Sequence, residues 1–175
     1  MTRESVFTLP NLVSTSRFAL ALGFVAIDAA PVRLALIGIA SVTDVLDGWL
    51  ARRTKLVTQF GAMLDPIADR FFVLGVIVAY IAGGQLTMLQ AALIMLRDVM
   101  SVIGFLVARL VSWLRDIPFR ARPIGKVVTA AQLFTFFAVL LLPAWVGTLV
   151  WIVGALGLAA SVDYTLMLWR ERRRV

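Results

Sequence analysis

Long apolar runs alternate with short polar segments along this chain, and six such runs occur. Each has close to the ~20 residues that a helix needs to cross the hydrocarbon core of a bilayer. The runs cover residues 12–30, 32–51, 60–82, 86–114, 124–142 and 145–169. Pro31, the pair Gly83 and Gly84, and Pro143 mark three of the turns between them. The pattern predicts an all-α integral membrane protein with six transmembrane helices, in a single domain over residues 1–175.

The basic residues predict the orientation of these helices. Most lie in polar segments that share one side of the membrane if all six runs span it: Arg3, Arg52, Arg53, Lys55, Arg115, Arg120, Arg122, Lys126, Arg170, Arg172, Arg173 and Arg174. The opposite side offers only Arg33. The positive-inside rule therefore places both termini in the cytoplasm. In an alternative interpretation, the run after Arg17 is a cleaved signal peptide, which would leave five spans and break this charge pattern.

The composition favours lipid over nucleic acid as the surroundings of the chain. Hydrophobic residues make up 61% of the 175 residues, whereas a soluble domain is nearer to about half. The net charge is +7, but the basic residues stand between apolar runs, as expected for contact with anionic headgroups. No nucleic acid partner is predicted. Because cysteine and histidine are both absent, any metal must be bound by oxygen, which favours Mg²⁺, Mn²⁺ or Ca²⁺.

Four aspartates interrupt the second and third apolar runs. Asp44 and Asp47 are three residues apart, and Asp65 and Asp69 are four apart, so each pair lies on one face of its helix. The short basic loop between the runs makes the two helices antiparallel neighbours. Four carboxylates then converge near the inner membrane face. Since they repel one another, they need a cation, and two divalent ions would balance their charge.

Small residues and one arginine accompany these acids. Gly48 and Gly61 carry no side chain, and Ala51 carries a small one, so a helix or a substrate can approach closely. Arg52 can donate a forked pair of hydrogen bonds to a phosphate.

Two other interpretations of the acids remain open at this level. Individual aspartates can cap helices, conduct ions or pair with Arg70 or Arg97. The four together can form the site of a cation transporter, although transporters often contain internal repeats, and we find no repeat in this sequence.

Together the residues form the pattern D-x2-D-G-x2-A-R-x8-G-x3-D-x3-D, filled by Asp44, Asp47, Gly48, Ala51, Arg52, Gly61, Asp65 and Asp69. This pattern resembles the motif of the CDP-alcohol phosphotransferase family. TLPNLVSTSR near the N-terminus, RDVM at 97–100 and GKVVTAAQ at 125–132 also resemble members that make phosphatidylglycerophosphate or cardiolipin. The resemblance covers nearly the whole chain, and it implies six helices and a homodimer.

The resemblance also implies a reaction in phospholipid synthesis. A CDP-linked lipid, commonly CDP-diacylglycerol, binds through its pyrophosphate to two Mg²⁺ or Mn²⁺ ions, an acceptor hydroxyl attacks the phosphorus nearer the lipid, and CMP leaves. By motif position, the resemblance implies that the metal ligands are Asp44, Asp47 and Asp65. It implies that Asp69 is the general base and also contacts a metal. The implied CDP-lipid site consists of Gly48, Ala51, Arg52 and Gly61. Such an enzyme is expected in the bacterial cytoplasmic (inner) membrane, with its active site at the cytoplasmic face.

The acceptor is predicted from cations outside the motif. Arg97, Arg122 and Lys126 suit an acceptor that carries phosphate, although they can instead pair with an acid or extend to lipid headgroups. Glycerol 3-phosphate is the expected acceptor. Phosphatidylglycerol, from which the product would be cardiolipin, is the alternative acceptor. An inositol phosphate is the third candidate. RDVM resembles cardiolipin synthases, because phosphatidylglycerophosphate synthases more often carry glutamate where this chain has Asp98.

Overall fold

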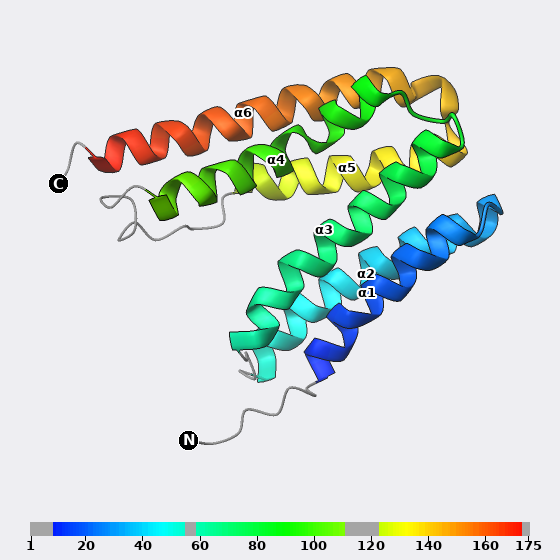
Figure 1. Cartoon of the computed structure of the whole chain (residues 1–175), viewed down its shortest axis with the longest axis horizontal. Coiled ribbons are helices and arrows are strands. Elements are labelled where there is room, and N and C mark those ends of the chain that lie inside the picture. Colours follow the sequence, from blue (N-terminus) through cyan, green and yellow to red (C-terminus); the bar gives the residue numbers. More distant parts are fainter. Residues whose placement is uncertain (1–8, 55–58, 111–122, 173–175) are drawn as a thin grey trace. The chain divides into compact units, whose positions relative to one another are not determined.

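A computed structural model describes residues 9–54, 59–110 and 123–172. The side chains that lie outside this description are those of residues 9–13, 45, 47–54, 59–65, 105, 108, 109, 123, 168 and 170–172. The chain divides into two compact units, Met1–Leu86 and Thr87–Val175. In the described ranges each unit is built on three α-helices (Figure 1). The all-α prediction is therefore confirmed for these residues.

The first unit is centred on its N-terminal helix. Its helices are α1 (Leu9–Ala26), α2 (Ala30–Thr54) and α3 (Gln59–Ala82). Helix α1 packs against both α2 and α3. In the core, Phe24 of α1 meets Phe72 and Tyr80 of α3 edge-on, with ring centroids 6.4 and 5.4 Å apart. Pro31 lies in the first turn of α2, where a missing N–H costs no helical hydrogen bond.

The second unit is organised around its C-terminal helix. Its elements are α4 (Met88–Leu110), α5 (Pro123–Leu141), the 3₁₀ turn η2 (Pro143–Trp145) and α6 (Val146–Arg172). Helix α6 packs against α4 and α5. A Cβ added at Gly154 would lie 3.2 Å from Cδ2 of Leu93, so the absence of a side chain lets α6 approach α4 closely.

The turn predicted at Gly83 and Gly84 is confirmed. Gly84 has a φ of +69°, a left-handed conformation that glycine adopts without steric cost. After it, Thr87 and Gln90 form a reciprocal cap, in which Thr87 N donates to Gln90 Oε1 at 2.8 Å and Gln90 N donates to Thr87 Oγ1 at 3.3 Å. This cap explains why α4 begins at Met88, two residues later than the apolar run suggested.

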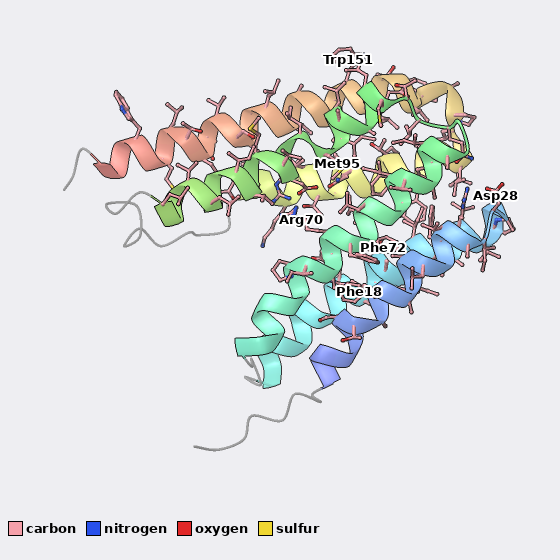
Figure 2. The ribbon with its side chains drawn as sticks, viewed as in Figure 1. Phe18, Asp28, Arg70, Phe72, Met95 and Trp151 are labelled. Carbon is pink, nitrogen blue, oxygen red and sulfur yellow. The ribbon has the colours of Figure 1, made fainter. Side chains whose placement is uncertain are left out.

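Large apolar side chains cover the outer surfaces of both units. Strongly exposed examples are Leu22, Val78, Met88, Leu89, Leu110, Trp145 and Trp151. Figure 2 shows Trp151 projecting away from α6. In the described residues, Ile124–Leu141 and Pro143–Met167 are long and apolar enough to cross a membrane, and the part Ser14–Ala26 of α1 is a shorter apolar helical segment. An apolar exterior of this kind suits contact with lipid.

Candidate active site

Asp44 and Asp69, two acids of the sequence motif, meet at one buried arginine. Nη2 of Arg17 donates to Oδ1 of Asp44 at 3.2 Å, and Nη1 of Arg17 forms an ion pair with Oδ1 of Asp69. Arg17 comes from α1, Asp44 from α2 and Asp69 from α3. The Arg17 side chain is 2% exposed, whereas the two aspartate side chains are about half exposed, at 50% and 48%. One guanidinium thus joins three helices at a surface that a ligand can reach.

The rest of the motif lies in the same two helices. Asp47, Gly48, Ala51 and Arg52 belong to α2, and Gly61 and Asp65 belong to α3. Their backbones are helical, as the spacing predicted, and their side chains lie outside the described residues. Of the four acids, the structure therefore brings together Asp44 and Asp69, and the convergence of Asp47 and Asp65 on them stays a prediction.

Close packing between α1 and α3 fixes the position of Arg17. Phe18, the next residue, packs on Phe71 with ring centroids 4.9 Å apart. One turn along, a Cβ added at Gly75 would lie 3.2 Å from Cβ of Ala21. Because a side chain at Gly75 would crowd Ala21, the glycine is what permits this spacing between the two helices.

The donor chemistry of the site fits a hard divalent cation. Both described acids offer carboxylate oxygens, from two helices, α2 and α3, that each pack on α1, and Mg²⁺ and Mn²⁺ prefer oxygen ligands. A carboxylate has two oxygens with several acceptor positions, so a bond from Arg17 to Oδ1 is compatible with a metal at the same carboxylate. Among the side chains that the structure describes, no group of three or more potential metal ligands occurs. Asp47 and Asp65, the remaining predicted ligands, are not among those side chains.

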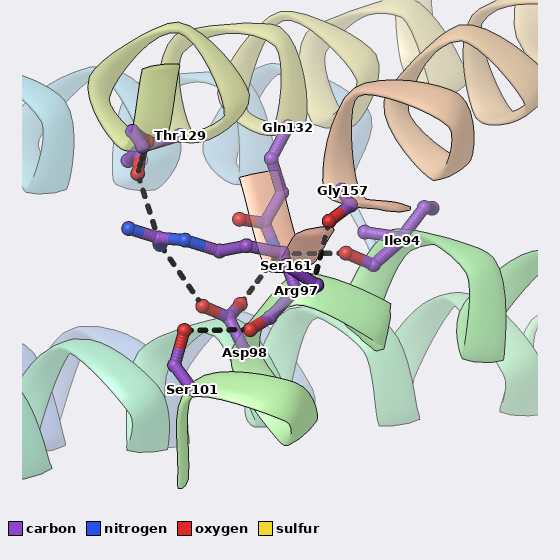
Figure 3. Close-up of polar contacts among 9 residues, drawn as sticks. Ile94, Arg97, Asp98, Ser101, Thr129, Gln132, Gly157 and Ser161 are labelled. Carbon is purple, nitrogen blue, oxygen red and sulfur yellow. Dashed lines mark hydrogen bonds and ion pairs between the residues drawn. The ribbon is translucent and has the colours of Figure 1, made fainter. Parts of the chain in front are cut away.

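A second polar cluster lies in the other unit, around Arg97 (Figure 3). Nη1 of Arg97 donates to Oδ1 of Asp98 at 3.2 Å and to Oγ1 of Thr129 at 3.4 Å. Nε2 of Gln132 donates to Oδ2 of Asp98 at 3.1 Å. Asp98 and Gln132 are buried, whereas the Arg97 side chain is 19% exposed. The cluster therefore anchors a partly accessible guanidinium on a buried carboxylate.

A glycine in α5 makes room for the Arg97 side chain. A Cβ added at Gly125 would lie 2.9 Å from Nη2 of Arg97, so any larger residue would displace the guanidinium. Lys126, the next residue, is exposed, and Arg122 lies outside the described residues. Of the three predicted acceptor-binding residues, Arg97 and Lys126 thus lie in one unit, on α4 and α5.

Sequence reasoning missed the role of Arg17. Among the described residues, Arg97, which was considered as a partner of the acids, pairs with Asp98, and Arg17, which was not considered, pairs with Asp44 and Asp69. The available signal was a charged residue inside the first apolar run, which is costly in a membrane unless it is paired.

Comparison with known proteins identifies the protein family to which the chain belongs. The sequence pattern of the family described as CDP-alcohol phosphatidyltransferase matches residues 7–162. The chain belongs to this family of membrane enzymes. Family membership favours an enzyme over a cation transporter and confirms the resemblance seen in the motif.

Individual relatives show which members of the family the chain resembles. The chain is 38% identical over 153 residues to the CDP-diacylglycerol–glycerol-3-phosphate 3-phosphatidyltransferase of Pectobacterium atrosepticum, covering 78% of this chain and 79% of the relative. It is 36% identical over 156 residues to the protein of the same name in Sodalis glossinidius, covering 80% and 75%. A probable cardiolipin synthase (CMP-forming) of Drosophila melanogaster is 31% identical over 114 residues, covering 63% of this chain and 35% of that protein.

Proposed function

We propose that this protein transfers the phosphatidyl group of CDP-diacylglycerol to glycerol 3-phosphate, forming phosphatidylglycerophosphate and releasing CMP. The observation that supports this class of reaction is that Asp44 and Asp69, from two helices, lie together at an accessible surface. The acceptor is supported by the relatives from Pectobacterium and Sodalis, which carry that activity in their names and align over more than three quarters of this chain.

In the proposed step, the acceptor hydroxyl oxygen attacks the phosphorus that carries the diacylglycerol. The bond from that phosphorus to the CMP oxygen breaks, CMP leaves with the electron pair, and the hydroxyl proton passes to the carboxylate of Asp69. This role requires Asp69 to come within hydrogen-bonding distance of the hydroxyl, and its half-exposed side chain is accessible to an acceptor. Arg52 would donate to the nucleotide phosphates, and Gly48, Ala51 and Gly61 would leave space for the CDP moiety.

We further propose two Mg²⁺ or Mn²⁺ ions at the aspartates. Asp44, Asp47, Asp65 and Asp69 would hold them, since four carboxylates balance two divalent charges. When bound, such ions withdraw charge from the pyrophosphate and stabilise the leaving CMP.

Arg97, Arg122 and Lys126 are proposed to bind the phosphate of the acceptor. The ion pair with Asp98 anchors Arg97, while Nη2 lies close to the backbone of α5 at Gly125, next to Lys126. A phosphate with two negative charges is well matched by a fixed guanidinium and a mobile ammonium. Phosphatidylglycerol remains the competing acceptor, supported by the Drosophila relative and by Asp98 in the RDVM segment.

The proposed setting is a bacterial cytoplasmic membrane, crossed six times by a single domain of residues 1–175, with both termini and the active site on the cytoplasmic side. The charge distribution along the sequence supports this orientation, and the exposed apolar side chains support lipid contact. A homodimer is proposed from the family resemblance alone.

The test is CMP release by the purified protein with radiolabelled CDP-diacylglycerol, offered glycerol 3-phosphate and phosphatidylglycerol in parallel, with Mg²⁺ or Mn²⁺. We expect a water-soluble acceptor to be consumed and phosphatidylglycerophosphate to appear. Chelation by EDTA should stop the reaction, and either ion should restore it. Cardiolipin as the product would replace the acceptor assignment, and no CMP release with any acceptor would refute the transferase proposal.

A further inference from the structure

Arg17 carries a buried charge that lies outside the acidic motif and outside the proposed acceptor site. Arg17 is 1% exposed, and a buried guanidinium is costly unless charged partners compensate it. Its described partners are Asp44 and Asp69, the first and last acids of the motif, which come from two different helices. We propose that Arg17 is a positioning residue for phosphatidyl transfer, one that holds the metal-binding carboxylate of Asp44 and the basic carboxylate of Asp69 in a single arrangement. This inference rests on the function proposed above.

The geometry of the guanidinium supports this role. Nη1 of Arg17 binds Asp69 and Nη2 binds Asp44, so two nitrogens joined through one carbon contact two separate carboxylates. Because the guanidinium is rigid and planar, it sets the spacing between the two Oδ1 atoms. A lysine at this position would keep the charge, but its single ammonium cannot impose that spacing.

The backbone that carries Arg17 is itself held in place. Phe18 packs on Phe71 of α3, and Ala21 contacts α3 at Gly75 one turn further along α1. These contacts lie immediately beside Arg17, so the guanidinium projects from a fixed part of α1. Its position is therefore determined by helix packing that involves none of the motif acids.

Charge balance provides a second argument. Asp44 and Asp69 repel each other when both are ionised, and an interposed cation lowers this repulsion. Arg17 supplies one positive charge at both carboxylates. This charge lowers the energetic cost of holding the two carboxylates close together.

Substitution Arg17→Lys separates positioning from charge. Lysine retains the positive charge but lacks the two forked donor nitrogens of arginine. We therefore expect kcat and the affinity for Mn²⁺ to fall roughly 10–100-fold, as for other residues that orient metal ligands. Mn²⁺ binding is measured by electron paramagnetic resonance on the purified protein without substrates, and unfolding by a thermal melt. The matched control is Arg33→Lys, at another buried arginine of the same unit, which pairs with Asp28 at 2.6 Å. This control should retain the wild-type kcat and Mn²⁺ affinity.

An arginine that merely joins the helices would give a different result. In that case Arg17→Lys would lower the melting temperature, while kcat per folded molecule and Mn²⁺ affinity would match the wild type, and the proposal would be wrong. If the wild-type protein releases no CMP, the proposed function fails instead, and the Mn²⁺ measurement still reports on Arg17.

Chemical rescue gives an independent measurement. Substitution Arg17→Ala removes the forked guanidinium group and leaves space for a small cation. We expect ethylguanidinium to restore part of kcat and ethylammonium, which has the same charge, to restore none. Equal rescue by both cations, or rescue by neither, would contradict positioning by a forked donor. If one of the two variants does not fold, the other decides the question.

Discussion

Gln132 of α5 donates a hydrogen bond from Nε2 to Oδ2 of Asp98 in α4 at 3.1 Å, and both side chains are buried. Asp98 also accepts a hydrogen bond from Arg97 at 3.2 Å. The amide of Gln132 therefore orients the carboxylate that anchors the proposed acceptor-binding arginine. A chain of two bonds connects the core of the second unit to a partly exposed guanidinium.

Substitution Gln132→Leu tests this anchoring. It leaves a buried carboxylate oxygen without its amide donor, which should cost about 1–3 kcal/mol of unfolding free energy. The KM for glycerol 3-phosphate should rise more than kcat falls, because Arg97 would be held less firmly. A reversible unfolding titration in detergent and steady-state kinetics measure the two effects. Thr129→Val is the comparison, since it removes the 3.4 Å bond from Arg97 and the bond from Thr129 Oγ1 to the Gly125 carbonyl but leaves Asp98 and Gln132 in place. An equal effect from it would argue against anchoring through Asp98.

Substitution Asp69→Asn tests the proposed base. The amide cannot accept the hydroxyl proton, so kcat should fall roughly 10²–10⁴-fold. Mn²⁺ binding should persist, because Oδ1 of asparagine can still accept the bond from Arg17. The comparison is Asp28→Asn, which changes an acid that is 88% exposed and should leave kcat unaltered. Loss of Mn²⁺ binding in Asp69→Asn would show that metal binding, rather than proton acceptance, is the main role of Asp69.

Substitution Gly125→Ala tests the space beside Arg97. The added Cβ would lie 2.9 Å from Nη2, so the guanidinium must move away from its present position. We expect a rise of about tenfold in the KM for glycerol 3-phosphate, equal to about 1.4 kcal/mol and typical of losing a hydrogen bond to a charged group. Gly104→Ala, where an added Cβ meets nothing within 4 Å, should leave KM unchanged. Similar KM values for both variants would remove Arg97 from the acceptor site.

Substitution Gly75→Leu tests how α1 is held against α3. The larger side chain would collide with Ala21 and push the helices apart, at a cost of about 1–3 kcal/mol. Because Arg17 lies on α1, kcat should fall together with stability. Gly38→Leu in α2, at a position with nothing within 4 Å of the added Cβ, should change neither quantity. A destabilised Gly75→Leu protein with unchanged kcat per folded molecule would show that this packing does not position Arg17.

The local pattern of the sequence was sufficient to predict the helices. Apolar runs of membrane-spanning length correspond to helices in the described residues, and Gly83–Gly84 forms the expected turn. These features depend on neighbouring residues, which sequence patterns record directly. The boundary at Met88 differs from the apolar run because the cap between Thr87 and Gln90 is a side-chain interaction that hydropathy does not register.

By itself, the sequence determined the family and the motif, since the spacing of the acids within two helices is a local property. Only the tertiary structure decided which cations meet which acids. Arg17 contacts Asp69 across 52 positions of the chain, and Gln132 contacts Asp98 across 34. Such pairs depend on which helices pack together and at what distance, and Gly75 and Gly125 set two of those distances through side chains that they lack. Helix packing therefore decided that Arg17 meets Asp44 and Asp69.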